Sequence, residues 1–387
     1  GLPNRGNIAS SAQAPDKNMN MRKTIVLSII LILTIPVMSQ AQWNIFRGDQ
    51  QLLGVSNTKI PDAPKLLWST KPGDGILASP VVSDGIIVVG SENGFIYALN
   101  SSGEKIWEFE TDNAIEASAL ILDGTVFIGS LSGTLYALDL KSGRKKWEYL
   151  TENQIMGSPN YWTEGGKTSL VVGSYDYYLH CIDAETGKGL WKYESDNFIN
   201  GAAGCFDGKA IFGGCDGFLH IVNIASGNSL AKVEVASYVA NSVAVIDNKA
   251  FVGDYDGRFS CVDLVGQKVI WKFEEKDANL PFIGSPSIKD GLVVIGNRDK
   301  NVYCFDQENG NLLWKTNSGS RVDASPVIVG KKVVIANMRG DLQILNLKDG
   351  KIIWNYEIGT GLVGNPAVTD KKIWVAASDG FIYCFGK

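Results

Sequence analysis

The sequence predicts an all-β fold built from a repeated unit of four short strands, and three observations carry this prediction. A Gly turn followed by a strand with a Trp recurs along the chain, as in "LNSSGEKIWEFE" and "IDAETGKGLWKYE". The 43 glycines among 387 residues fit many tight turns. Alternating and β-branched segments are frequent, whereas no stretch has a convincing helical period. A four-stranded repeat of about 40 residues is the pattern of a propeller blade.

Aligned on the Trp, the repeat is present eight times. Consecutive copies lie 39 to 44 residues apart, and one gap of 80 residues contains a copy in which Ala231 replaces the Trp. A large aromatic residue at a fixed repeat position predicts packing between neighbouring blades. We expect this structural role for seven residues: Trp68, Trp107, Trp147, Trp191, Trp271, Trp314 and Trp354.

The first strand of each copy is expected to lie innermost, beside a central channel. It begins with a small residue, in keeping with eight strands that converge on one axis: Ala78, Ala117, Gly157, Gly201, Ala240, Gly284, Ala324 and Gly364. Proline follows two residues later in five copies, at Pro80, Pro159, Pro286, Pro326 and Pro366. Proline inside a sheet is confined to edges, which favours a strand with one side turned to the channel.

The two ends of the repeat predict how the ring closes. The first Trp strand, "KLLWST", precedes any first strand, and the C-terminal "FIYCFGK" stops after a third strand. We therefore expect the N-terminal strand to complete the last blade, which covers an otherwise open edge. The prediction is one eight-bladed β-propeller over residues 65–387, preceded by an extension over 42–64.

Residues 1–41 are interpreted as upstream sequence and a secretory signal. Arg22 and Lys23 precede an apolar run that ends in Ser39-Gln40-Ala41. That order of charge, apolar core and small residues is typical of a signal peptide, and the run is shorter than a membrane helix requires. The expectation is export to the periplasm or cell surface, cleavage near Ala41, and a mature form without a transmembrane span.

Composition narrows the function classes. The net charge of −5 offers no basic field for nucleic acid. Both histidines, His180 and His220, take one repeat position, which favours packing over catalysis, and no hydrolase or zinc motif is present. Four of the six cysteines also share one repeat position, where they are expected to be small buried residues without disulfides: Cys181, Cys261, Cys304 and Cys384.

The turn-and-Trp phrases, "DAETGKGLW" and "CFDQENGNLLW" among them, resemble the docking motif of pyrroloquinoline-quinone (PQQ)-type repeats. The resemblance covers essentially the whole expected mature chain and implies the eight-bladed fold. One branch with this motif contains quinoprotein alcohol dehydrogenases, and another contains non-catalytic propellers similar to BamB, a scaffold lipoprotein of outer-membrane protein assembly. The segment "WNIFRGDQQLLGVS" also resembles the N-terminal extension of exported PQQ-like repeat proteins. This chain departs from BamB because no Cys lies near the cleavage point to carry a lipid anchor.

The dehydrogenase branch implies PQQ and Ca²⁺ at the channel mouth, with an acid, an Asn and an Asp as ligands. The residue before each small position is expected near that mouth, and three of these residues carry polar oxygens: Glu116, Asn200 and Asp323. Carboxylate and amide oxygens suit a hard cation. Against this alternative, no two Cys are adjacent to form the vicinal disulfide that the resemblance implies, and the short blades lack the loops of a cofactor lid.

The loops between second and third strands are expected to open on the same face as the channel mouth. Tyr, Met and Arg are enriched in protein interfaces, so these loops are the candidate partner-binding surface, through Tyr175, Tyr255, Arg298, Met338 and Arg339. The leading interpretation is an exported, monomeric, non-enzymatic scaffold in the cell envelope that binds a protein partner without a cofactor. The alternatives are a PQQ- and Ca²⁺-dependent dehydrogenase and a polysaccharide-binding propeller that uses exposed Tyr.

Overall fold

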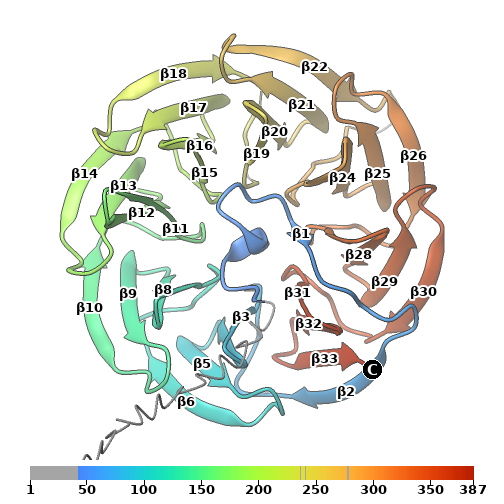
Figure 1. The fold of residues 1–387 in the computed structure, drawn as a ribbon, viewed down its shortest axis with the longest axis horizontal. Helices are drawn as coiled ribbons and strands as arrows, with labels where there is room; N and C mark the ends of the chain where they lie inside the picture. The colour runs from blue at the N-terminus through green and yellow to red at the C-terminus, as the bar shows by residue number, and fades with distance from the viewer. Residues whose placement is uncertain (1–41, 236, 240, 277–278) are drawn as a thin grey trace, which may run out of the picture. The chain divides into compact units, whose positions relative to one another are not determined.

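A computed structural model describes residues 42–235, 237–239, 241–276 and 279–387. Its strands form eight four-stranded blades around a centre, and each blade runs from a short inner strand to a long outer strand (Figure 1). The predicted all-β propeller with eight blades is therefore confirmed. The predicted signal over residues 1–41 lies outside the described residues. No helix among the described residues is long and apolar enough to cross a membrane.

The strands of blades 1 to 4 are given from the innermost outward. They are β3 (Val81–Ser83), β4 (Ile86–Gly90), β5 (Phe95–Leu99) and β6 (Lys105–Glu110); β7 (Leu120–Leu122), β8 (Thr125–Gly129), β9 (Thr134–Asp139) and β10 (Lys145–Leu150); β11 (Asn160–Glu164), β12 (Lys167–Gly173), β13 (Tyr178–Asp183) and β14 (Gly189–Glu194); β15 (Gly204–Phe206), β16 (Lys209–Gly213), β17 (Phe218–Asn223) and β18 (Ser229–Glu234).

Blades 5 to 8 repeat this order. They contain β19 (Ala244–Ile246), β20 (Lys249–Gly253), β21 (Arg258–Asp263) and β22 (Lys268–Glu274); β23 (Ser287–Lys289), β24 (Leu292–Gly296), β25 (Asn301–Asp306) and β26 (Leu312–Asn317); β27 (Val327–Val329), β28 (Lys332–Ala336), β29 (Asp341–Asn346) and β30 (Ile352–Glu357); β31 (Ala367–Thr369), β32 (Lys372–Ala376), β33 (Ile382–Gly386) and β2 (Lys65–Thr70). The antiparallel pairing of β2 with β33 confirms the predicted closure by the N-terminal strand.

The Trp side chains join neighbouring blades, as predicted. Trp191 on β14 donates its indole N–H to Ile224 O in blade 4 at 2.8 Å, and five further Trp residues make the equivalent bond. A Gly with positive φ, such as Gly227, lies against each of these six rings, where an added Cβ would come within 3 Å of the indole or of a neighbouring side chain. The predicted small cysteines stand opposite Trp in the strand register, as Cys181 does with Trp191, and all are buried and free.

The small residues ahead of the inner strands are required by the neighbouring blade. A Cβ on Gly157 would lie 2.7 Å from Gly201 O, and a Cβ on Gly201 would lie 2.3 Å from Asn241 O. The atoms that exclude a larger side chain are those of the neighbouring blade's backbone, as expected where inner strands converge. The fifth copy was also placed one residue out of register. Asn241 stands in the small position there, and the proposed Ala240 lies outside the described residues.

The N-terminal extension was given no role by the sequence, yet residues 43–59 form a strap that contacts every blade. In Figure 1 the strap crosses the centre of the ring, and its 3-10 turn η1 (Phe46–Gly48) lies there. Strap carbonyls or side chains bond the inner strands of all eight blades, from Trp43 on Val82 to Ser56 and Thr58 on Val368 and Thr369. The short β1 (Val55–Ser56) adds a parallel fifth strand to blade 7.

Arg47 anchors the strap from inside the protein. Its side chain is 1% exposed, and Nη2 donates to Pro286 O at 3.1 Å and to Ser287 Oγ at 2.8 Å. Burial lowers the pKa of this guanidinium to about 9. A Cβ on Gly54 would lie 1.8 Å from Arg47 Nη2, so this turn of the strap requires glycine. The strap therefore covers the channel-facing edges of the inner strands where it crosses them.

Candidate functional site

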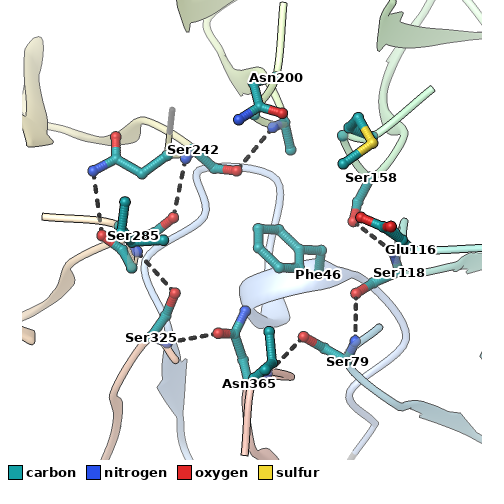
Figure 2. Close-up of a pocket in the computed structure, with 18 of the residues that line it drawn as sticks. Phe46, Ser79, Glu116, Ser118, Ser158, Asn200, Ser242, Ser285, Ser325 and Asn365 are labelled. Carbon is teal, nitrogen blue, oxygen red and sulfur yellow. Dashed lines mark hydrogen bonds between the residues drawn. The ribbon is translucent and has the colours of Figure 1, made fainter. Parts of the chain in front are cut away.

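The central channel is closed at one end by the strap. Figure 2 shows Phe46 of η1 in the middle of a ring of residues that precede the inner strands. The remaining cavity has a volume of about 170 Å³ and is lined by Phe46 and by residues from all eight blades. The channel is thus a shallow blind cavity and not an open pore.

A ring of hydrogen bonds surrounds this cavity, and the sequence analysis did not identify it. At seven of the eight positions after the small residue, the backbone N–H donates to the side chain of the equivalent residue in the next blade, as in Ser79 N to Ser118 Oγ at 2.9 Å. Seven of these bonds link the eight blades, and the acceptors are Ser118, Ser158, Ser242, Ser285, Ser325, Asn365 and Ser79 (Figure 2). The eighth bond is missing because Ala202 has no hydroxyl.

The three predicted oxygen donors all line the cavity, but two of them are engaged by other side chains. Arg298 donates Nε and Nη2 to the two oxygens of Asp323, at 3.0 Å each. Tyr175 donates its hydroxyl to Asn200 Oδ1 at 2.8 Å, and burial raises the pKa of this phenol to about 12. Burial also raises the pKa of Glu116, and the nearby Glu92 carboxylate raises it further.

These residues do not fit a site for Ca²⁺ and a quinone. The oxygens of Asp323 that a cation would need already accept from a guanidinium. The cavity of about 170 Å³ is smaller than the roughly 300–1,000 Å³ of ordinary small-molecule sites, and Phe46 stands in its centre. Within the described ranges, no group of three or more His, Cys, Asp or Glu side chains is placed to hold a metal ion.

Around the cavity, the loop face has a rim built from eight equivalent residue pairs. In each blade, one member of the pair lies in the loop that leads into the inner strand, directly before a buried residue of that loop. Its carbonyl accepts a hydrogen bond from the backbone N–H of the other member, which lies in the loop between second and third strands. By blade, these pairs are Gly75 and Glu92, Ala114 and Leu131, Gln154 and Tyr175, Phe198 and Cys215, Tyr238 and Tyr255, Pro281 and Arg298, Arg321 and Met338, and Gly361 and Ser378.

The residue types on the rim are unevenly distributed. Blades 3 to 5 carry an aromatic arc, which consists of Tyr175, Phe198, Tyr238 and Tyr255. Blades 6 and 7 carry an arginine arc, which consists of Pro281, Arg298, Arg321 and Met338. Small residues dominate blades 8 to 2. The same backbone hydrogen bond recurs in all eight blades. The rim therefore has one backbone arrangement throughout, and only its side chains differ along its length.

Four of the five predicted partner-binding residues lie on this rim, and the fifth, Arg339, is adjacent to it. Arg298 is held by Asp323, and this bond together with the Asp323 charge raises its pKa. Arg321 is half-exposed, with its Nε 3.7 Å from Asp323. Arg339 donates to Asp341, whose carboxylate is buried. Arg298 and Arg321 therefore share the cavity acid Asp323, so this acid and the predicted partner-binding Arg298 belong to one charged cluster and not to two separate sites.

Phe198, Tyr238 and Arg321 are absent from the sequence prediction because they lie in the loops that lead into the inner strands, and not in the loops between second and third strands. The repeat does predict their position, because each stands directly before the buried residue at the start of a copy. These buried residues are Ile199, Val239 and Val322. The histidines proved structural, as predicted. His180 and His220 are buried, and each lies between a Tyr hydroxyl of the preceding blade and an Asp of its own blade.

Solved structures with the same fold come from both branches that the sequence resembles. BamB from Moraxella catarrhalis is 17% identical with a TM-score of 0.72, over 84% of this chain and 100% of that one. The quinohemoprotein alcohol dehydrogenase from Comamonas testosteroni is 14% identical with a TM-score of 0.74, over 89% and 80%. The computationally designed protein Ika8 is 17% identical with a TM-score of 0.71, over 82% and 98%. At these identities the likeness concerns the fold. No protein with a curated description matches the sequence.

A family model also matches the sequence. The model described as outer membrane protein assembly factor BamB matches residues 61–161 and 215–385, which is more than half of the chain. The matched segments include most of the blades and the closing strand β2. On this match, the chain belongs to the PQQ-type repeat family whose model bears the description outer membrane protein assembly factor BamB.

Proposed function

We propose that this chain is an exported, non-enzymatic scaffold of the cell envelope, and that the arginine arc of its rim contacts a protein partner. Family membership supports the scaffold role and the envelope location, because the family description names an assembly factor of the outer membrane. The shallow cavity with Phe46 at its centre gives no comparable support to a quinone-dependent dehydrogenase.

The observation that carries this proposal is the arginine arc. Arg321 and Met338 are neighbours on the rim, joined by the bond from Met338 N to Arg321 O at 3.0 Å. Arg321 is half-exposed, whereas Arg298 beside it is fixed by Asp323. Arg is among the residues that contribute most to interface affinity. A guanidinium that is already partly fixed loses less conformational entropy on binding than a freely moving one. An acidic or carbonyl-rich protein surface is the matching partner.

The test is partner capture by crosslinking in cells that express the protein, with quantification by mass spectrometry. Arg321→Ala with Met338→Ala should reduce the captured partner at least about tenfold, the effect of ~1.4 kcal/mol. The matched control is Arg144→Ala with Leu313→Ala, which removes an exposed arginine and an exposed apolar residue away from the rim. Equal loss in both double variants, or loss in neither, contradicts the assignment of the arginine arc.

A further inference from the structure

The aromatic arc encloses a second cavity, distinct from the channel. It has a volume of about 320 Å³ and is lined by Tyr175, Asn197, Phe198, Asn200, Cys215, Tyr238 and Tyr255. Asn200 belongs to the walls of both cavities, so the two adjoin at the channel mouth. The volume lies at the lower end of the range for small-molecule sites.

One wall of this cavity is a rigid aromatic platform. The rings of Tyr175 and Phe198 stack with centroids 4.6 Å apart and an interplanar angle of 23°. The Tyr175 hydroxyl bond to Asn200 and the bond from Cys215 N to Phe198 O fix both residues. Across the cavity, Tyr238 and Tyr255 are joined by their own backbone bond. They remain 58% and 42% exposed, so their rings are accessible to a ligand from solvent.

The lining identifies the chemistry of the ligand. None of the seven lining residues is charged, which disfavours an anion. None is an aliphatic Leu, Ile or Val, so the cavity lacks the aliphatic lining that would suit the apolar face of an amphipathic helix. What remains is a set of aromatic faces beside two carboxamides and tyrosine hydroxyls, and these groups can stack and form hydrogen bonds at once.

We propose that the aromatic cavity binds a neutral pyranose unit of an oligosaccharide. One face of a pyranose presents C–H groups with partial positive charge, which are attracted to the negative faces of aromatic rings. Its hydroxyls lie at the ring edge, where Asn197 and the hydroxyls of Tyr238 and Tyr255 can exchange hydrogen bonds with them. The open cavity beside the channel mouth lets the rest of the chain continue over the rim. This site goes beyond the protein-scaffold role and does not depend on it.

The experiment is titration calorimetry of the purified protein against neutral hexasaccharides of glucose, N-acetylglucosamine and mannose, with choline as a cationic probe. We expect at least one saccharide to bind with micromolar to millimolar affinity, and Tyr238→Ala with Tyr255→Ala to weaken it at least about tenfold. Leu150→Ala is the control, since Leu150 is an exposed apolar residue on outer strand β10. Melting curves should show the tyrosine variant folded, because both side chains are largely exposed.

Each other outcome overturns the proposal. Binding of choline but of no saccharide makes the cavity a cage for quaternary ammonium groups. Saccharide binding that survives loss of both tyrosines places the site elsewhere. If no saccharide binds and the tyrosine variant instead loses the crosslinked protein partner, the aromatic arc is part of the protein interface. The variant of Arg321 and Met338 should keep saccharide binding, so failure of this site and failure of the arginine arc can be told apart.

Discussion

Two neighbouring blade junctions solve the same packing problem with different chemistry. At the junction of blades 3 and 4, Trp191 donates to Ile224 O and its ring contacts Gly227. Two residues further along β14, the Tyr193 hydroxyl lies 3.1 Å from His220 Nδ1, and His220 Nε2 lies 2.9 Å from Asp216. The neutral imidazole with its proton on Nε2 satisfies both contacts.

At the junction of blades 4 and 5, the three ring-bearing side chains are replaced. Ala231 stands for the Trp, Val233 for the Tyr, and Ser260 for the His. An aliphatic cluster fills the space, to which Val233, Val235 and Leu264 contribute. The comparison shows that the fold does not require a Trp at every blade junction. Directional bonds fix the first junction, whereas non-directional apolar packing holds the second.

The largest expected effect comes from breaking the first junction. Trp191→Ala should lower the free energy of unfolding by about 2–4 kcal/mol, somewhat less than the ~3–5 kcal/mol for a fully buried Trp, because its ring is only partly covered. Hydrogen exchange is expected to be slower in β14 than in β18 in the unmodified protein, and the variant should remove that difference.

Leu190→Ala is the control for this prediction, because Leu190 is the exposed neighbour on the same strand. It should change the unfolding free energy by well under 1 kcal/mol. Similar exchange in β14 and β18 before any mutation would mean that the two kinds of junction are equally strong.

A smaller, pH-dependent effect should also separate the junctions. Burial raises the pKa of Asp216, but the hydrogen bonds from His220 and from the backbone N–H groups of Phe218 and Asp196 outweigh it, so the net pKa lies below the ordinary 3.8. A carboxyl with a lowered folded pKa stabilises the protein above its unfolded pKa. That contribution is lost as the pH falls below 3.8 and through the folded value.

Asp216→Asn should therefore flatten the loss of melting temperature between pH 5 and pH 3. The equivalent residue at the second junction, Asp256, is exposed and serves as the matched control. Asp256→Asn should leave the acid limb of the melting curve unchanged. If both variants change the melting temperature between pH 5 and pH 3 in the same way, the contacts of Asp216 at the junction do not cause the pH dependence.

The fold could be read from the sequence because a propeller repeats its local rules. Gly turns, alternating strands and the Trp position recur in each copy, and a terminal half-blade predicts the closing strand β2. The strap could not be predicted in this way, because residues 43–59 occur once and satisfy inner-edge groups that no periodicity describes. The register of the fifth copy failed for a related reason. Its Asn241 departs from the small-residue rule, and only the bonds of Ser242 reveal its alignment.

The candidate site was harder to predict because it depends on differences among copies. Arg298 and Asp323 come from separate copies and meet only when neighbouring blades pack, so the sequence predicts two sites where the structure has one pair. The aromatic arc likewise combines two positions of the repeat from three successive blades. Such a cluster is visible only when both positions are compared around the ring.

The smallest expected effect concerns the one gap in the hydrogen-bond ring, which also falls between blades 3 and 4. Ser158 N has no side-chain acceptor in the next blade because Ala202 stands where the other blades have Ser or Asn. Ala202→Ser should supply that acceptor and raise the free energy of unfolding by about 0.5–1.5 kcal/mol. Ala203→Ser is the matched control, since it places a hydroxyl in the apolar cluster of the same blade and should destabilise. A gain at both positions, or at neither, would mean that the ring of bonds does not hold the blades together, and that close contact between their backbones is sufficient.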